Sequence, residues 1–503
     1  MAYHESMYFL VFLPVVLIGY QLAPKRVRFG VLLFFSYCFY FLLSHRLIVY
    51  LLGATTITYL TGRLVATGEK KRRKTILIVG VWLLLGMLLV MKYSGFFAEN
   101  VNALFGTINL GLRLPVRRFL LPLGISFYTL SAIGYMADVY WKKIEPEKNI
   151  AKLALFLSFF PIIMEGPICM YSDTAETLAK GEDIRSENLM RIGWGLLKKV
   201  VIADRLYVVV QTLFDGYASY HGVMIVVAAV SYTVQLYMEF SGCMDIVIGS
   251  AECFGVTLPE NFAQPFVSKN ASEFWRRWHI SLGRWFKTYI FYPVSMSKLT
   301  RKWNRFAKKH TSKYIKLMVA SAIALFPVWV CNGLWHGANW SYLFYGMYYF
   351  VVIMIELMLE PAVKKLCAAW KIAEDAAWWN VLRILKTWVI IFTGELFFRA
   401  DTLGIGMHMF RSLFHDFSIQ KLWDGTLLTL GLGRVEIGII LVSLLIVGVV
   451  NHFREQQIDV RGVILQKRLP VRWLVYLALI FVVLIFGAYG PGYQEVDLIY
   501  AGF

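Results

Sequence analysis

The stretch KLMVASAIALFPVWVCNGLWHGANWSYLFYGMYYFVVIMIEL, residues 316–357, decides the fold class. Its two apolar parts, near 317–334 and 339–359, each approach the roughly 20 residues that a helix needs to cross a bilayer. The polar sequence CNGLWHGANW, residues 331–340, lies where they meet. Because an ionisable group at membrane depth is costly, His336 is a candidate functional residue by default.

The composition extends this interpretation to the whole chain. Of 503 residues, 58% are hydrophobic and only 17% charged, which indicates an integral membrane protein. We expect an all-α polytopic membrane protein with about 11 transmembrane helices, the other apolar stretches being re-entrant or interfacial. The first run follows MAYHES, which lacks a basic segment, and is expected to be a retained span. The apolar stretches lie near 7–23, 29–44, 46–62, 75–91, 119–140, 151–169, 190–214, 222–250, 317–334, 339–359, 380–398, 434–451 and 472–490.

The formal net charge of +19 would suggest nucleic-acid binding in a soluble domain. In a membrane protein, basic loops that set the orientation and meet anionic lipid headgroups explain this charge better, so no nucleic-acid partner is expected. Basic loops at 24–28, 68–74 and 141–148 follow the first, third and fifth apolar stretches, which predicts cytoplasmic loops and an N-terminus outside. The six cysteines are scattered without the spacing of a metal or redox site.

Residues 258–316 form a basic segment with very few acidic residues. This segment is expected to lie on or dip into the membrane rather than cross it. A single membrane domain that spans residues 1–503 is expected. Within it, Asn270 or Ser272 is predicted to cap a helix with Glu273 in its first turn. An interfacial amphipathic helix explains the interleaved tryptophans and arginines without any ligand, but it does not require His279.

A polar face surrounds His336 if residues 329–340 are helical. Asn332 then lies four residues before the histidine and Asn339 three after it, so the three side chains share one face. Gly333 and Gly337 keep this face thin and allow close approach of a helix or a long ligand. A histidine that merely hydrogen-bonds between helices is the alternative interpretation.

The chain lacks a GxSxG elbow, an HExxH motif, a CxxC pair and a Walker loop, so the common hydrolase, zinc and nucleotide sites are missing. A lone general base remains. Histidine titrates near neutrality and can take a proton from an attacking alcohol. With a thioester as acyl donor the leaving group is already good, and no enzyme nucleophile or metal is needed.

A series of sequence blocks follows the order known from one protein family. The blocks are KYSGFF (92–97), LPLGISFYTLSAIGYMADVY (121–140), FFPIIMEGPI (159–168), GLLKKVVIADRL (195–206), YMEFSGCMDIVIG (237–249), NFAQPFVSKNASEFWRRWHISLGRWF (261–286), GLWHGANWSYLFYGMYY (333–349) and FFRAD (397–401). In these blocks the sequence resembles the membrane-bound O-acyltransferase family, in particular its bacterial alginate O-acetyltransferase-like branch.

This resemblance implies a ring of tilted membrane helices around a thin central channel, with a funnel from outside meeting a cytoplasmic entrance. His336 matches the catalytic histidine of the family's WHG motif, and His279 matches the second histidine of its RWHxSL motif. We expect His336 and His279 to be catalytic. The predicted substrate-binding residues are Asn332, Trp275, Arg276, Trp335 and Asn339.

The family reaction implies an acyl thioester, acetyl-CoA or an acyl carrier protein, as a co-substrate rather than a bound cofactor. It also implies a multi-pass protein of the bacterial cytoplasmic (inner) membrane, in contact with lipid. A secreted or membrane-anchored esterase-like (SGNH-type) acetyltransferase is the expected partner, and an extracellular polysaccharide the final acceptor. After Phe286 the chain reads KTYIFYPVSM, where alginate-type members read RDYLYIPLGG, so the acceptor stays open. D-alanyl transfer to teichoic acid and a non-catalytic transporter or scaffold are the alternatives.

Overall fold

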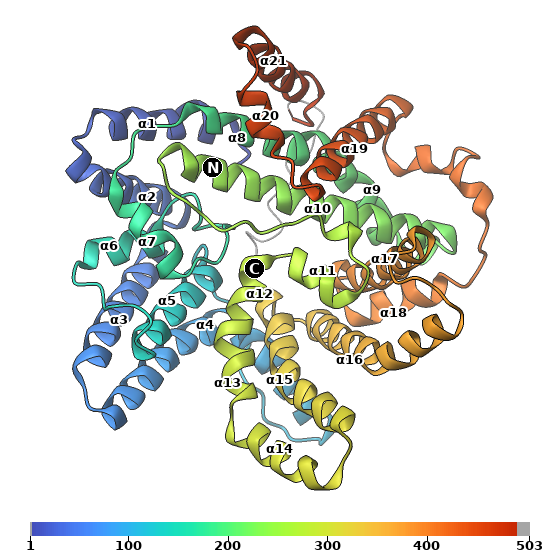
Figure 1. Ribbon diagram of the computed structural model, residues 1–503, viewed down its shortest axis with the longest axis horizontal. Coiled ribbons are helices and arrows are strands. Elements are labelled where there is room, and N and C mark those ends of the chain that lie inside the picture. The colour runs from blue at the N-terminus through green and yellow to red at the C-terminus, as the bar shows by residue number, and fades with distance from the viewer. Residues whose placement is uncertain (1–2, 490–503) are drawn as a thin grey trace. The chain divides into compact units, whose positions relative to one another are not determined.

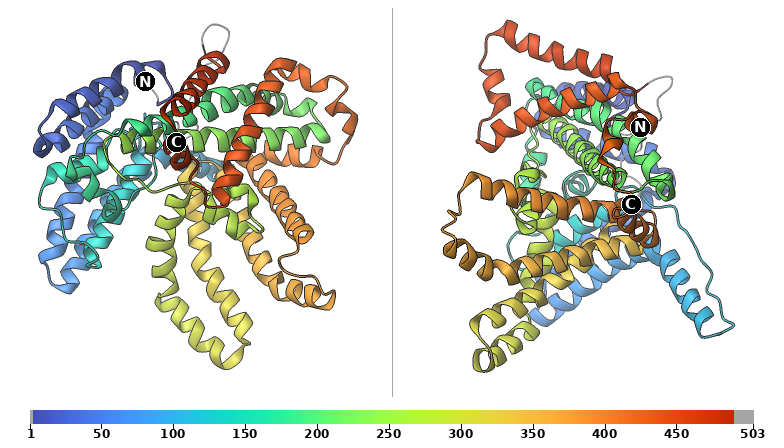
Figure 2. Two further views of the ribbon diagram at one scale, coloured as in Figure 1. Left: turned by 45° about the horizontal axis from the view of Figure 1, so that its top comes forward. Right: turned by 90° about the vertical axis from the view of Figure 1, so that its right-hand side faces the viewer.

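The computed structural model describes residues 3–489, and this part of the chain is built almost entirely of helices (Figures 1 and 2). None of the described residues forms a strand, and a single isolated bridge pairs Phe262 with Trp278. The all-α class expected from the sequence is confirmed.

The described residues group into two compact units that share the helix α10 (Val223–Cys253). The expected single membrane domain stays a prediction. The first unit, 3–195 and 243–260, holds α1 (Leu13–Leu22), α2 (Arg28–Ser44), α3 (Ile48–Thr67), α4 (Lys70–Thr107), α5 (Ile125–Tyr140), α6 (Ile150–Ser158), α7 (Tyr171–Lys180) and α8 (Leu189–Leu196). The second unit, 196–242 and 261–489, holds α9 (Asp204–Asp215), α11 (Ala271–Arg277), α12 (Ile280–Phe286), α13 (Tyr292–Ser295), α14 (Lys298–His310), α15 (Lys313–His336), α16 (Trp340–Ala369), α17 (Ala377–Arg399), α18 (Leu403–Ser412), α19 (Arg434–Glu455), α20 (Val460–Leu465) and α21 (Leu469–Phe486).

Shorter helical turns join these elements. Segments with π-helical hydrogen bonds are η1 (Tyr8–Phe12), η5 (Leu197–Ala203) and η8 (Lys287–Phe291). The 3-10 turns are η2 (Lys25–Val27), η3 (His45–Leu47), η4 (Ser186–Asn188), η6 (Tyr217–Ser219), η7 (Pro265–Val267), η9 (Ile419–Leu422) and η10 (Thr426–Leu430).

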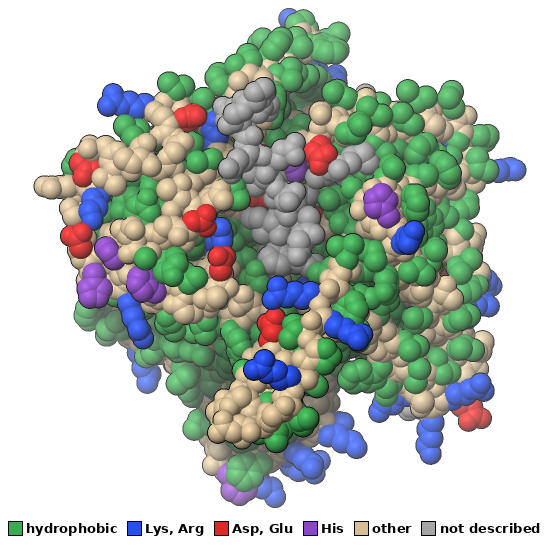
Figure 3. All heavy atoms as spheres, turned by 180° about the vertical axis from the view of Figure 1, so that it is seen from behind, with side chains coloured by type: hydrophobic (Ala, Val, Ile, Leu, Met, Phe, Trp, Pro, Cys, Tyr) green, Lys and Arg blue, Asp and Glu red, His purple; other side chains and the backbone are tan. Residues whose placement is uncertain are grey.

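Seven helical segments among the described residues are long and apolar enough to cross a membrane. They confirm a multi-pass membrane protein, although the expected number of about 11 spans is not confirmed by this count. Apolar side chains cover much of the face shown in Figure 3, as a surface in contact with lipid requires. The segments are Lys25–Thr67, Lys71–Thr107, Val223–Cys253, Lys313–His336, Trp340–Ala369, Arg434–Glu455 and Leu469–Phe486.

In the first unit, α5 forms a buried helix whose start depends on one glycine. Every residue from Ile125 to Val139 is buried. Gly124 precedes the helix with φ +66°, and a Cβ there would lie 1.8 Å from the carbonyl oxygen of Ile163. Only glycine fits this position, because other residues avoid the left-handed conformation and none would avoid the clash.

In the second unit, α15 and α16 form an antiparallel hairpin with unusually close backbones. A Cβ on Gly333 would lie 2.4 Å from the carbonyl oxygen of Tyr342, and a Cβ on Gly346 would lie 2.3 Å from that of Trp329. A Cβ on Gly337 would meet the Tyr342 ring at 2.6 Å. The predicted role of Gly333 and Gly337 in close helix approach is therefore confirmed.

Buried ion pairs lie within each unit. In the second, Lys199 Nζ lies 2.8 Å from Asp204 and 3.1 Å from Glu239. In the first, Arg191 pairs with Asp245 at 3.1 Å. Glu239 and Asp245 thus both pair with cations outside the basic segment 258–316.

Candidate active site

His336 is the last residue of α15, where the helix stops against an aromatic cage. Gly337 leaves the helix with φ 166° and ψ 172°, so no further turn covers the imidazole. The side chain is nevertheless buried, with 3% exposed. The ring centroids of Trp335 and Phe398 each lie 4.9 Å from that of His336, and the ring of Tyr345 lies at 5.9 Å. These aromatic contacts hold the imidazole in a water-poor place.

His279 lies at the break between α11 and α12. Its backbone has φ 48° and ψ 51°, a left-handed conformation that costs a residue with a side chain about 1–3 kcal/mol. Such local strain is common where a side chain is aimed at a functional site. The imidazole is buried, with 3% exposed, and its Nδ1 lies 3.3 Å from Asn261 Oδ1.

The neighbours of Asn261 fix which nitrogen of His279 carries the proton. The backbone N–H and the hydroxyl of Ser281 both donate to Asn261 Oδ1, at 3.0 and 2.9 Å. This atom must therefore be the amide oxygen, which only accepts. His279 Nδ1 then donates to it, and Nε2 carries the lone pair. Because burial lowers the pKa of His279 to about 3, the imidazole is neutral at physiological pH.

Trp335 contacts both histidines. Its ring centroid is 5.4 Å from that of His279 and 4.9 Å from that of His336, and only 7% of the residue is exposed. The structure thus brings His279 and His336, far apart in sequence, into contact with one indole ring. Their catalytic role stays a prediction.

A cavity of about 310 Å³ adjoins this group, and most of its wall is apolar. His279 and Asn332 contribute polar atoms to it, while Arg276 and Lys287 line it from exposed positions. Asn332 is 4% exposed, and its side chain makes no hydrogen bond within the part of the chain that the structure describes. Its amide is therefore available to a ligand. The other lining residues are Ser272, Trp275, Trp278, Leu282, Gly283, Phe286, Phe291, Leu325, Val328, Trp329, Ile353 and Leu357.

Asn339 does not line this cavity, and the prediction of one polar face through residues 329–340 is wrong. The helix ends at His336, and Asn339 instead caps α16 by accepting the backbone N–H of Ser341 at 3.0 Å. Its Nδ2 donates to the carbonyl oxygen of Asp401 at 2.8 Å. The extended Gly337 breaks the helical spacing on which the prediction depended.

The expected amphipathic helix after Asn270 is present but differs from the prediction. Asn270 caps α11 by accepting the N–H of Glu273 at 2.8 Å, which confirms the predicted helix start. The helix then breaks at His279. Four of the aromatic residues lie inside the protein rather than at a membrane surface, with 1–5% exposed: Phe274, Trp278, Trp285 and Phe286. Trp275 also turns inward, against Trp329 and Tyr349.

Two further residues contact the site without a role predicted from the sequence. Asn261 lies in one of the family blocks, and Glu395 accepts the hydroxyl of Tyr345 at 2.8 Å. The signal for Glu395 was available, because it is a carboxylate within the apolar stretch 380–398. Among the described residues, no cluster of histidine, cysteine or acidic side chains has the arrangement of a metal site.

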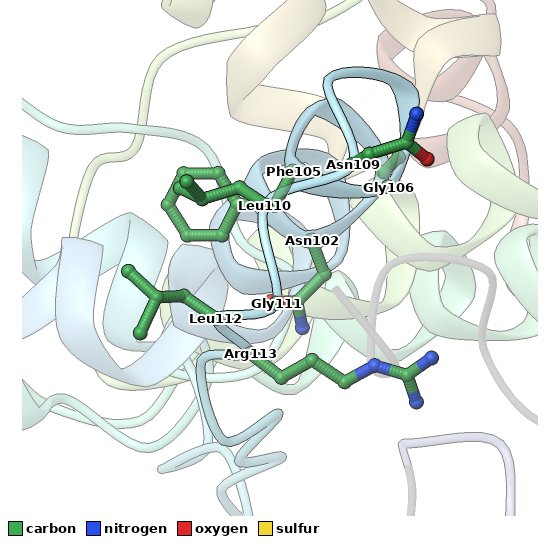
Figure 4. A pocket seen from close by; sticks show the side chains of 9 residues that line it. Asn102, Phe105, Gly106, Asn109, Leu110, Gly111, Leu112 and Arg113 are labelled. Atoms are coloured by element: carbon green, nitrogen blue, oxygen red, sulfur yellow. The ribbon is translucent and has the colours of Figure 1, made fainter.

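Another hollow, of about 530 Å³, lies at the end of α4 (Figure 4). The chain after α4 folds back along the helix, and Asn102 holds it through two hydrogen bonds with the backbone of Leu114, at 2.7 and 2.9 Å. Arg113 lines this hollow. None of the predicted site residues lies there.

Comparison with known proteins gives consistent matches. Residues 146–308 match the model of the membrane-bound O-acyltransferase family. The chain is 32% identical over 419 residues to a probable alginate O-acetylase AlgI of Pseudomonas syringae pv. tomato, covering 82% of this chain and 75% of that protein. It is 27% identical to a peptidoglycan O-acetyltransferase of Helicobacter pylori, with coverage of 82% and 79%. A teichoic acid D-alanyltransferase of Bacillus subtilis is 28% identical, with coverage of 55% and 68%.

Proposed function

The chain belongs to the membrane-bound O-acyltransferase family, and we propose that it passes an acyl group across the membrane. The group would be acetyl, and it would serve the O-acetylation of an extracellular polysaccharide. The acyl donor would be a cytoplasmic thioester. The observation that carries the proposal is the pair of buried histidines that both contact Trp335, one of them on the wall of the 310 Å³ cavity.

His336 would act as the general base. Its imidazole takes the proton of the acceptor hydroxyl while the hydroxyl oxygen attacks the thioester carbonyl carbon. The new C–O bond forms, the C–S bond breaks, and the thiolate that leaves takes the proton back from the imidazolium. Burial among Trp335, Tyr345 and Phe398 excludes water, which disfavours hydrolysis of the thioester as a side reaction.

Asn332 and His279 would bind the donor. No side-chain hydrogen bond joins Asn332 to His336 in the described residues, so we assign the side-chain amide of Asn332 to the thioester rather than to the histidine. As a neutral imidazole with its lone pair on Nε2, His279 can accept a hydrogen bond from an amide N–H of a pantetheine-like arm. Trp275, on the cavity wall, would pack against the same arm.

Exposed cations at the cavity would attract the donor. Arg276 and Lys287 line it from exposed positions, and α14 adds six exposed lysines and arginines between Lys298 and Lys309. Acetyl-CoA and an acidic acyl carrier protein are both anionic, so such a surface would raise their local concentration. We place this surface in the cytoplasm and the protein in the bacterial inner membrane, with its N-terminus outside.

On the acceptor side, we propose an extracellular polysaccharide as the final acceptor and an esterase-like (SGNH-type) protein as the partner. The alginate O-acetylase relative aligns with 82% of this chain and the teichoic acid D-alanyltransferase with 55%, which favours polysaccharide over teichoic acid. D-alanyl transfer is the second candidate.

Purified protein in liposomes tests the proposal. Labelled acetyl-CoA, or a D-alanyl carrier protein, is supplied on one side, and a polysaccharide with the partner on the other. We expect covalent acetyl label on the acceptor side. Label that crosses without any covalent transfer would instead show a transporter, and transfer from the D-alanyl carrier alone would support the second candidate.

A further inference from the structure

Glu395 of α17 is a buried carboxyl group close to the site. The residue is 1% exposed. One carboxyl oxygen, Oε1, accepts the hydroxyl of Tyr345 at 2.8 Å, and the other, Oε2, has no hydrogen-bond partner among the described residues. None of the described lysines or arginines pairs with it. Burying a carboxyl group without a cation is costly, so its single strong contact, Tyr345, indicates where it acts.

Tyr345 contacts both Glu395 and His336. Its ring is 2% exposed and stands nearly perpendicular to the imidazole, at 86° with a centroid distance of 5.9 Å. Phe398, three residues after Glu395 on α17, lies 4.8 Å from the Tyr345 ring and 4.9 Å from the His336 ring. Helix α17 therefore reaches His336 twice, directly through Phe398 and indirectly through Tyr345.

The backbone around Glu395 is held closely against α16. A Cβ on Gly394 would lie 2.4 Å from the hydroxyl oxygen of Tyr349, so glycine at this position lets the two helices meet. The ring of Tyr349 lies 5.0 Å from that of Tyr345. These close contacts restrict the movement of the Glu395 carboxyl group. The carboxyl group can therefore hold Tyr345, to which it is hydrogen-bonded, in one position.

We propose that Glu395 is a positioning residue for His336: by accepting the Tyr345 hydroxyl it holds the tyrosine ring edge-on against the imidazole and so sets the orientation of the base. His336 needs such support because it ends its helix and Gly337 turns away behind it. The inference rests on the proposed function, since it concerns the orientation of a general base. Partners that orient a functional side chain are typically worth about 10–100-fold in activity.

Two variants break this contact and one preserves it. Tyr345→Phe removes the donor, and Glu395→Leu removes the acceptor. Glu395→Gln keeps an oxygen that accepts the hydroxyl. In reconstituted protein we expect the first two to lower kcat about 10–100-fold with the KM for the thioester donor unchanged. Glu395→Gln should keep most of the activity.

Tyr348→Phe is the matched control. Tyr348 lies on the same helix and also donates to α17, to the carbonyl oxygen of Ile390 at 2.9 Å, but no ring contact joins it to His336. We expect it to keep the kcat of the unchanged protein. The double variant Tyr345→Phe with Glu395→Leu should lose no more activity than either single variant, because both break one contact.

The outcomes separate the inference from the proposed function. If the unchanged protein transfers acyl groups and Tyr345→Phe matches it in kcat, the positioning role is overturned and the proposed function stands. If Glu395→Gln loses as much kcat as Glu395→Leu, the hydrogen-bond acceptor is not what matters, and the inference fails as well. Absence of transfer by the unchanged protein would contradict the proposed function itself. Should Glu395→Leu not fold, Tyr345→Phe and Glu395→Gln still decide the question.

Discussion

At the scale of single residues, the neutral state of His279 makes the stability of the protein depend on pH. Burial lowers the pKa of His279 to about 3, below its value of about 6.5 in an unfolded chain. The unfolded state therefore binds the extra proton first as the pH falls. The contribution of His279 to stability is complete above pH 6.5 and is lost progressively toward pH 3.

We predict that lowering the pH from 7.5 to 5 lowers the free energy of unfolding of the unchanged protein by about 2 kcal/mol more than that of His279→Gln. Unfolding in detergent at the two pH values measures the difference. His310→Gln serves as the control, because His310 is exposed at the end of α14. An equal loss in the unchanged protein and in His279→Gln would show that His279 is not buried as a neutral group.

How much of the site was predictable also differs from residue to residue. His336 and Asn332 could be found from the sequence, because a polar residue in an apolar helix is unusual and both lie within one turn. The exclusion of Asn339 could not, because it depends on Gly337 leaving the helix. Asn261 and Glu395 act through contacts with residues 18 and 50 positions away, and local spacing says nothing about such pairs.

At the scale of elements, η5 shows how an irregular helix accommodates charge in an apolar surrounding. Lys199 lies in this π-helical segment and is 0% exposed, yet it contacts the carboxylates of Asp204 and Glu239. Irregular π turns are frequent where a side chain must be redirected. The sequence predicted helices here but not the widened turn, because that turn has no simple sequence period.

We predict that Lys199→Met destabilises the protein by about 3–5 kcal/mol, because it removes the buried ammonium group that Asp204 and Glu239 both contact. Thermal unfolding in detergent measures the loss. Lys386→Met is the control: Lys386 pairs with Glu356 from a half-exposed position, where an ion pair is worth about 1 kcal/mol or less. Equal effects of the two substitutions would contradict the buried pairing of Lys199.

At the scale of the whole molecule, the class of protein followed from composition and the orientation from the basic loops. The all-α membrane class is confirmed. It could be predicted because few other classes of protein have so large an excess of apolar residues. The number of spans was harder to predict, since apolar stretches that cross, dip into or line a membrane protein have similar compositions. The orientation stays a prediction.

Helix α4 offers a direct test of the orientation. Its 38 residues extend about 57 Å at 1.5 Å per residue, longer than the hydrocarbon core of about 30 Å, so the helix is long enough to place its two ends on opposite sides of the membrane. Lys71→Cys should be protected from a membrane-impermeant maleimide in intact cells, and Leu112→Cys, in the exposed chain after the helix, should react. The native cysteines are buried or partly buried, so their background is low. Reaction of Lys71→Cys alone would reverse the orientation.

The central claim is that His336 is the base of an acyl transfer, and one measurement tests it most directly. His336→Gln and the control His452→Gln, which changes an exposed histidine of α19, are each reconstituted in liposomes with labelled thioester and acceptor. We predict that His336→Gln inserts normally and transfers no acyl label above the protein-free rate, while His452→Gln transfers it as the unchanged protein does. Near-normal transfer by His336→Gln would contradict the account.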